Sequence, residues 1–116
     1  TMIEVTDDRF EELVDAALAQ IPDAVADRIR NVAFLIEDYN EASPYILGLY
    51  RGVALPKRTF DHTGYLPDTI TIYRQALKNI CNTEAELIEQ VRVTVMHEIG
   101  HYFGLDEDDL HRLGYG

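Results

Sequence analysis

The chain has 116 residues, enough for one domain with a modest hydrophobic core, and we expect residues 1–116 to form a single domain. Ten Lys and Arg residues against 21 Asp and Glu residues give a formal net charge of −11, which argues against nucleic-acid and membrane-surface partners. The single cysteine excludes an intrachain disulfide, and the lack of a signal-peptide pattern or a long apolar run predicts a cytoplasmic protein.

The N-terminal part of the chain predicts a helix followed by two strands. Thr6 precedes two acidic residues and an apolar pattern with three- and four-residue steps, which is typical of a capped amphipathic helix. Pro22 either ends this helix or begins a second short one. The apolar run over residues 32–36 predicts a buried strand, and residues 46–50, interrupted by Gly48, predict another.

The second half predicts one more strand and three helices, the last of which is short and covers residues 106–113. Residues 69–73 alternate threonine and isoleucine and give the clearest strand pattern, whose edge we expect to pair with an extended peptide. A short helix over residues 74–80 follows, and Cys81 is expected to be a small core residue rather than a nucleophile. Thr83 and Glu86 fit a capping box that starts a long helix.

The long helix carries the pattern His97-Glu98-x-x-His101. On a helix, residues four apart lie on one face about 6 Å apart along the axis, so both imidazoles can bind one Zn²⁺. Glu98 lies beside the metal without ligating it, where it can serve as the general base for an attacking water. A hydrolytic zinc site usually has a third protein ligand, and Gly104 stops the helix so that the chain can turn back toward the metal. The residues downstream that can ligate are Asp106, Glu107, Asp108, Asp109 and His111.

The motif resembles the zinc-binding consensus of zincin metallopeptidases with a glycine turn, HExxHxxGxx followed by His or Asp. Most of residues 46–116 is similar to a family of very small bacterial zincin-like proteins, sometimes called mini-zincins, on the segments 47–52, 66–74 and 113–115. This resemblance implies an α+β fold, a minimal zincin-like domain with a small twisted mixed β-sheet packed against an N-terminal helix and the HExxH helix. It also implies Zn²⁺ as the cofactor.

In this resemblance the third-ligand position is Glu107, where the family usually has Asp. Asp106 and His111 remain alternatives, as does a structure in which Glu107 caps the last helix and the ligand comes from elsewhere. Larger enzymes with this motif resemble one another in having a methionine turn under the metal, and no methionine follows His101 here. We expect Tyr115 to pack under or beside the ligands as the site floor, unless it is a frayed terminal residue.

These features predict a zinc-dependent metallopeptidase that acts on a peptide or protein substrate, with Glu98 as the general base and acid. Tyr115, Tyr102 and His62 are weak candidates for stabilising an oxyanion. The alternative is a non-catalytic or weakly active zincin-scaffold protein with a binding or regulatory role, and Glu98 argues against a purely structural zinc site. The sequence is also compatible with a homodimer.

Overall fold

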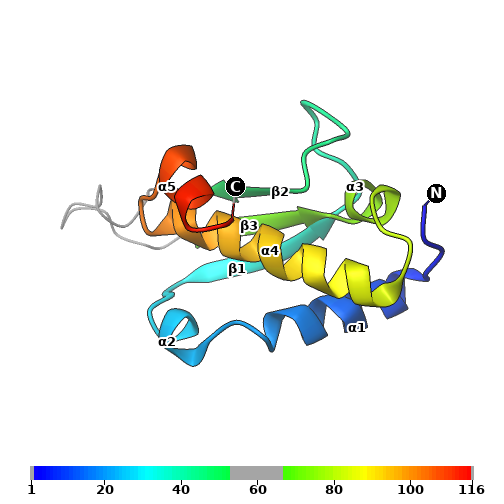
Figure 1. Cartoon of the computed structure of the whole chain (residues 1–116), viewed down its shortest axis with the longest axis horizontal. Helices are drawn as coiled ribbons and strands as arrows, with labels where there is room; N and C mark the ends of the chain where they lie inside the picture. Colours follow the sequence, from blue (N-terminus) through cyan, green and yellow to red (C-terminus); the bar gives the residue numbers. More distant parts are fainter. Residues whose placement is uncertain (1, 53–66, 116) are drawn as a thin grey trace.

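The computed structural model describes residues 2–52 and 67–115. His62 and most of the connection expected before the third strand lie outside these residues. Helix α4 crosses in front of a small sheet, and α1 runs alongside α4 (Figure 1). In chain order the elements are α1 (Asp7–Leu18), α2 (Asp23–Ala26), β1 (Val32–Glu37), β2 (Gly48–Arg51), β3 (Asp68–Tyr73), α3 (Arg74–Asn79), α4 (Glu84–Tyr102) and α5 (Glu107–Arg112).

The two long helices begin at the threonine caps that the sequence predicts. In α1 the Thr6 hydroxyl accepts a hydrogen bond from the Arg9 N–H at 3.1 Å. In α4 the Thr83 hydroxyl accepts from the Glu86 N–H, also at 3.1 Å. The Glu86 carboxylate accepts from the Asn82 N–H at 2.8 Å, one residue before the position that a capping box requires. The predicted helix starts are therefore confirmed, with the second half of the capping box displaced by one residue.

The three strands in the described part of the chain form one mixed sheet in the order β1-β3-β2. Strand β3 lies in the centre, parallel to β1 and antiparallel to β2. The prediction that β3 offers a free edge to a peptide is therefore wrong, because both of its edges are paired. Alternating threonine and isoleucine specifies which face of a strand is apolar, whereas the neighbours of the strand depend on distant segments.

Strand β1 also departs from its prediction. The sequence predicts a buried strand, yet Phe34 and Leu35 are each 41% exposed. Among the described strands β1 lies at one edge of the sheet and pairs only with β3, which explains the exposure. An apolar run marks strand propensity but does not distinguish an edge from the centre.

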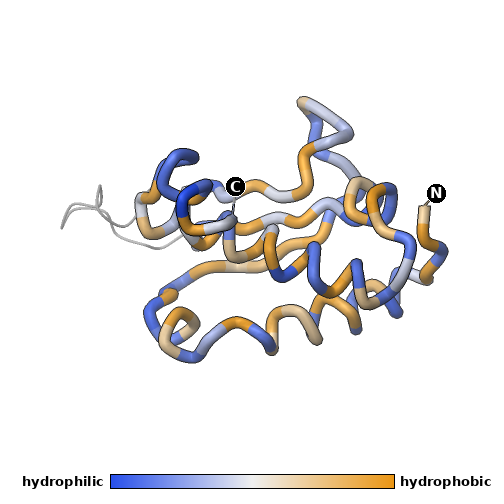
Figure 2. Tube along the Cα trace, viewed as in Figure 1, coloured by the Kyte–Doolittle hydropathy of each residue, from blue (hydrophilic) through white to orange (hydrophobic). Residues whose placement is uncertain are grey.

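The hydrophobic core lies between α1, α4 and one face of the sheet. Apolar residues recur along β3 and on α1 and α4 (Figure 2). Cys81 has no exposed surface, which confirms it as a core residue. The fold class is α+β, as expected. The buried members of the core are Phe10, Leu13, Val14, Ala17, Ile70, Ile72, Leu77, Cys81, Leu87, Val91, Val95 and Ile99.

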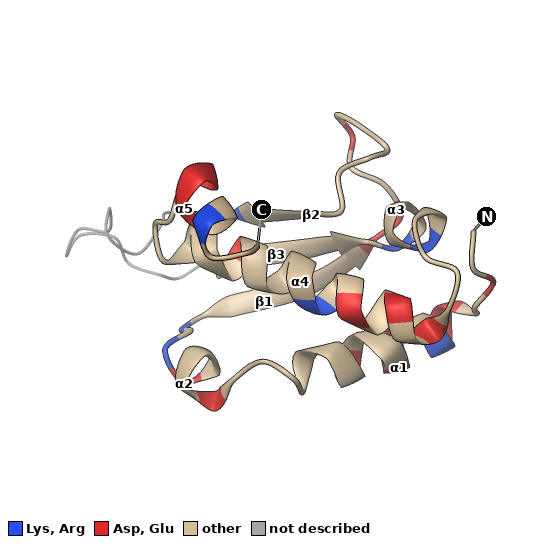
Figure 3. Cartoon of the chain, viewed as in Figure 1, with Lys and Arg blue, Asp and Glu red and all other residues tan. Residues whose placement is uncertain are grey.

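Acidic residues are spread over α1, the first half of α4 and α5 (Figure 3). Within residues 2–52 and 67–115, no helix is both long and apolar enough to cross a membrane.

Candidate metal centre

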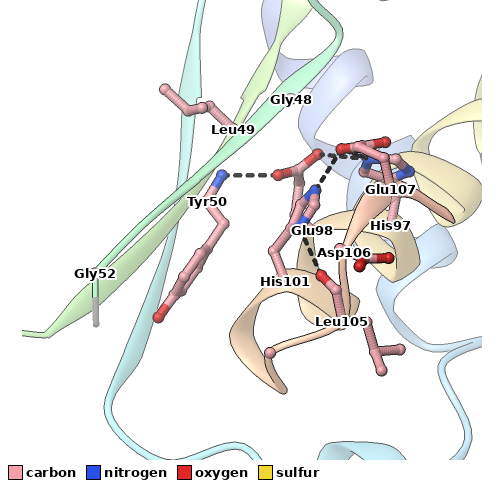
Figure 4. Close-up of a pocket in the computed structure, with 11 residues that line it drawn as sticks. Gly48, Leu49, Tyr50, Gly52, His97, Glu98, His101, Leu105, Asp106 and Glu107 are labelled. Carbon is pink, nitrogen blue, oxygen red and sulfur yellow. Dashed lines mark hydrogen bonds and ion pairs between the residues drawn. The ribbon is translucent and has the colours of Figure 1, made fainter. Parts of the chain in front are cut away.

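Helix α4 brings the three residues of its motif together. The ring centroids of His97 and His101 are 5.0 Å apart, and the rings stand nearly perpendicular at 77°. One ligating atom from each of His97, Glu98 and His101 lies within 4.8 Å of the other two (Figure 4). The four-residue spacing therefore produces the shared face that the sequence predicts.

A glycine turn ends α4 immediately after this face. Gly104 has φ 86°, in the left-handed region that favours glycine. The Leu105 N–H donates to the Gly100 carbonyl and the Gly104 N–H to the His101 carbonyl, both at 2.9 Å. These two bonds define a Schellman motif, which reverses the chain and lets α5 begin beside the histidines.

Helix α5 is capped by Asp106, and this leaves Glu107 free to face the histidines. Asp106 Oδ1 accepts from the Asp109 N–H at 2.8 Å, and Asp109 Oδ2 accepts from the Asp106 N–H at 3.1 Å. Glu107 Oε1 lies 3.2 Å from His97 Nε2 and 2.8 Å from His101 Nε2 (Figure 4). Of the carboxylates weighed as a third ligand, Glu107 is the one whose oxygen contacts both imidazoles, whereas Asp106 is engaged as the cap.

Each imidazole is oriented by a main-chain carbonyl. His101 Nδ1 donates to the Leu105 carbonyl at 3.0 Å, and His97 Nδ1 donates to the Tyr115 carbonyl. Because a carbonyl can only accept, Nδ1 carries the proton in both rings, and the lone pair of a neutral ring is then on Nε2. This is the arrangement in which outer hydrogen bonds fix metal-binding histidines.

The carbonyl that contacts His97 is placed by a second glycine turn. Gly114 follows α5 with φ 89°, and the Tyr115 N–H donates to the Leu110 carbonyl at 2.8 Å. The main-chain carbonyl of Tyr115 thus lies beside His97, and the packing of its ring as the floor of the site stays a prediction. Tyr102, a predicted oxyanion candidate, is 1% exposed, and its hydroxyl accepts from the Arg30 N–H at 3.2 Å.

The two oxygens of Glu98 have different surroundings. Oε1 accepts from the Tyr50 N–H of β2 at 2.8 Å, and Oε2 lies 3.9 Å from His97 Nε2. The residue is only 7% exposed. Burial raises the pKa of Glu98 above its ordinary value, although His97 and the Tyr50 N–H act in the opposite direction. A carboxylate with a raised pKa accepts a proton more readily, as a general base must.

The surroundings of His97 and Glu107 shift the pKa of each toward its charged form. Burial opposes the imidazolium, but the Tyr115 carbonyl, Glu98 and Glu107 together raise the pKa of His97. The small burial of Glu107 acts to raise its pKa, yet the two histidines lower it overall. The Glu107 carboxylate is therefore ionised at neutral pH and can balance the charge of a bound metal.

Two hollows flank His97 and Glu98 along the outer edge of β2. The larger, of about 680 Å³, opens on the side of Tyr50 and Glu107. The smaller, of about 330 Å³, lies toward Leu47 and Tyr115. The larger is lined by Gly48, Leu49, Tyr50, Gly52, His97, Glu98, His101, Gly104, Leu105, Asp106 and Glu107 (Figure 4), and the smaller by Leu47, Gly48, Gln90, Val93, Thr94, His97, Glu98 and Tyr115.

Main-chain groups are the parts of this centre that sequence reasoning missed. The Leu105 carbonyl and the Tyr50 N–H have no residue signature of their own. Their signals are indirect: a glycine directly precedes Leu105, and Gly48 in a strand marks close approach by another segment.

Fold and site together define a class: an α+β domain with a His-Glu-x-x-His helix, a glycine turn and a following carboxylate. The model of the zincin-like metallopeptidase family matches residues 29–116, and the chain belongs to this family. Its membership implies a zinc-binding metallopeptidase scaffold. No curated protein matches the chain.

A solved structure with a similar fold is that of a conserved hypothetical protein from T. thermophilus. The two chains are 20% identical with a TM-score of 0.59, and the match covers 85% of this chain and 94% of the other. At this identity the likeness concerns the fold alone.

Proposed function

We propose that the protein is a zinc-dependent metallopeptidase in which His97, His101 and Glu107 hold the metal. The observation that carries this proposal is the convergence of two Nε2 atoms and one carboxylate oxygen, at 2.8 and 3.2 Å. Ligands at zinc-like bond lengths in a tetrahedral site lie roughly 3.3 Å from one another, close to these separations. The Nδ1 hydrogen bonds support the same assignment, because they leave Nε2 as the ligating atom of each ring.

Glu98 is the proposed general base. A zinc ion bound at such a site supplies Lewis-acid chemistry that activates water and polarises a carbonyl. Oε2 faces the histidines and takes the proton from the attacking water, while Oε1 stays bonded to the Tyr50 N–H. Glu98 then returns this proton to the leaving amine of the cleaved peptide bond.

The proposed substrate is a peptide or protein segment in an extended conformation along the outer edge of β2. This edge replaces the edge of β3 that the sequence predicts, since β3 is paired on both sides. Among the described strands β2 pairs only with β3, and both hollows border it. An extended peptide there would pass His97 and Glu98 with side chains in either hollow.

A cleavage screen tests this function. The purified protein is loaded with one equivalent of zinc and incubated with a peptide library, and fragments are identified by mass spectrometry. We expect cleavage that a chelator abolishes and that added zinc restores. Glu98→Gln is the matched control, because it keeps the size of the side chain and removes the base. It should retain zinc and lose hydrolysis by a factor of about a hundred or more.

Two other outcomes of the screen would contradict parts of this proposal. Stoichiometric zinc without cleavage of any peptide would support the alternative of a non-catalytic zincin-scaffold protein. Hydrolysis that is unchanged in Glu98→Gln would remove Glu98 from the mechanism.

A further inference from the structure

Strand β2 packs against helix α4 at Gly48, where a side chain would not fit. A Cβ atom at this position would lie 2.6 Å from Thr94 Cγ2 and 3.2 Å from the Thr71 carbonyl oxygen. It would also lie 3.5 Å from Glu98 Cγ, which is ordinary contact. The first distance is shorter than real Cβ contacts allow, so a side chain here would displace one of the two elements.

Thr94 cannot easily move aside. It is 6% exposed and lies one helical turn before Glu98 on the same face of α4. Within a helix its β-branched side chain has only two common χ1 rotamers, and its burial between α4 and β2 leaves little space to exchange them. A methyl group at residue 48 would therefore push β2 outward rather than rotate Thr94.

The separation of β2 and α4 determines whether Glu98 keeps its main-chain partner. The Tyr73 N–H donates to the Leu47 carbonyl, so residues 47, 49 and 51 direct their main-chain groups toward β3. Tyr50 therefore directs its N–H away from β3, and this N–H meets Glu98 Oε1 at 2.8 Å. Figure 4 shows this bond joining the outer edge of β2 to the carboxylate.

The Tyr50 side chain anchors the same stretch of β2 through two further contacts, one with Asp68 and one with Tyr102. Its hydroxyl donates to Asp68 Oδ2 at 2.7 Å, and its ring stands edge-on to that of Tyr102 at 6.1 Å between centroids. Asp68 is only 5% exposed, so this contact is well shielded from water. The Tyr50 N–H is thus fixed relative to both the sheet and α4.

We propose that Gly48 is a positioning residue for the general base, an inference that rests on the proposed peptidase function. By admitting no side chain, it keeps β2 close enough to α4 for the Tyr50 N–H to hold Glu98 Oε1. That bond orients the carboxylate so that Oε2 faces the two histidines and receives the proton. Gly48 acts through Tyr50 and Glu98 and touches no substrate.

Amide hydrogen exchange tests the positioning independently of activity. In the wild-type protein the Tyr50 amide should exchange slowly, although it points away from β3. Gly48→Ala should accelerate this exchange by about tenfold or more, as expected for loss of a hydrogen bond to a charged group. Thr94→Ser removes the methyl that the new Cβ meets at 2.6 Å and leaves the milder contact with the Thr71 carbonyl oxygen at 3.2 Å. The double variant Gly48→Ala/Thr94→Ser should therefore recover most of the slow exchange. Thr94→Ser alone should exchange like the wild type.

A second pair of variants keeps β2 intact in case Gly48→Ala does not fold. Glu98→Ala removes the acceptor and should accelerate exchange at the Tyr50 amide, whereas Glu98→Gln keeps an oxygen at Oε1 and should retain protection. Fast exchange at Tyr50 in the wild type would overturn the proposal. So would equal exchange in Glu98→Ala and wild type, or a folded double variant without recovery.

Hydrolysis then separates positioning from binding. With zinc content unchanged, Gly48→Ala should lower kcat about tenfold or more with little change in KM, and Thr94→Ser in the same chain should restore it. A change in KM alone would overturn the positioning role. If no variant, wild type included, cleaves any peptide, the peptidase proposal fails, and the exchange data still decide whether Gly48 sets the Tyr50–Glu98 bond.

Discussion

At the scale of single residues, each of the three motif side chains uses one polar atom for a main-chain hydrogen bond and presents the other to the site. His97 and His101 use Nδ1 for a main-chain carbonyl, which leaves Nε2 for the site. Glu98 uses Oε1 for β2, which leaves Oε2 facing His97. The hydrogen bond at one atom of each side chain fixes the direction of its other polar atom before any ligand binds. The site is preorganised in this sense.

Glu107 is the residue at which the metal assignment is most directly tested. Its side chain is 69% exposed, so removing it should disturb the fold little. We expect Glu107→Ala to weaken zinc binding about ten- to hundredfold, because it removes one of the three proposed protein ligands. Asp108→Ala removes a neighbouring exposed carboxylate and is the matched control. Competition with a chromophoric chelator measures both, and equal affinities would return the assignment to Asp106 or His111.

Cys81 gives a prediction that depends on burial rather than on zinc. Burial is the main reason why the pKa of its thiol is raised, and Glu86 adds to the effect. Since the thiolate is the reactive form, a raised pKa keeps the thiol protonated and inert at neutral pH. A thiol reagent should therefore label the native protein far more slowly than the protein unfolded in guanidinium. Equal rates would show that Cys81 is not part of a stable core.

Side chains and main chain differ in how well the sequence predicts them. Because a helix places residues four apart on one face, the sequence spacing of His97 and His101 is enough to predict that their imidazole rings lie together. The carbonyls and N–H groups around them belong to residues such as Leu105 and Tyr115, whose identity says nothing about their main-chain direction. Only the preceding glycines give a sign of that direction, through the left-handed turns they permit.

At the scale of elements, the C-terminal ends of α4 and α5 both place a main-chain carbonyl beside a histidine of the site. Each ends in a glycine of positive φ, and the residue after that glycine offers its carbonyl to a histidine. The helix starts are predictable because capping is local in sequence. The order of the strands is not, because β1 and β3 pair across more than 30 residues and no local pattern records that choice.

Gly114 tests whether the turn after α5 supports the metal site. A Cβ at this position would meet no atom within 4 Å, so a substitution acts only through the backbone conformation. At φ 89° an alanine costs about 1–2 kcal/mol and should shift the Tyr115 carbonyl away from His97. We expect Gly114→Ala to weaken zinc binding about tenfold. Gly114→Asn, which tolerates left-handed backbone, is the matched control and should bind nearly as the wild type does; equal affinities in Gly114→Ala and wild type would contradict the role.

At the scale of the whole molecule, the site joins α5 to α4, and among the described residues these two helices share few other contacts. Helix α5 has six residues and buries one of them, Leu110, against Gly100 of α4. The remaining links between α5 and the body of the protein include Glu107 at the histidines and the Tyr115 carbonyl at His97. The protein is also strongly acidic, with a net charge of −11, so a bound divalent cation reduces its self-repulsion.

Zinc should therefore stabilise the protein as a whole. The proposed ligands come from α4 and α5, which lie together only in the folded chain, so the ion should bind the native state in preference to the unfolded one. With zinc at about a thousandfold above its Kd, linkage predicts ~4 kcal/mol of stabilisation, or a rise in Tm of roughly 10–20 °C for a domain of this size. Calorimetry with excess zinc and with a chelator measures the difference. Glu107→Ala should show a much smaller rise and Asp108→Ala the full one. A Tm that does not respond to zinc in the wild type would show that His97, His101 and Glu107 do not form a metal site that is linked to folding.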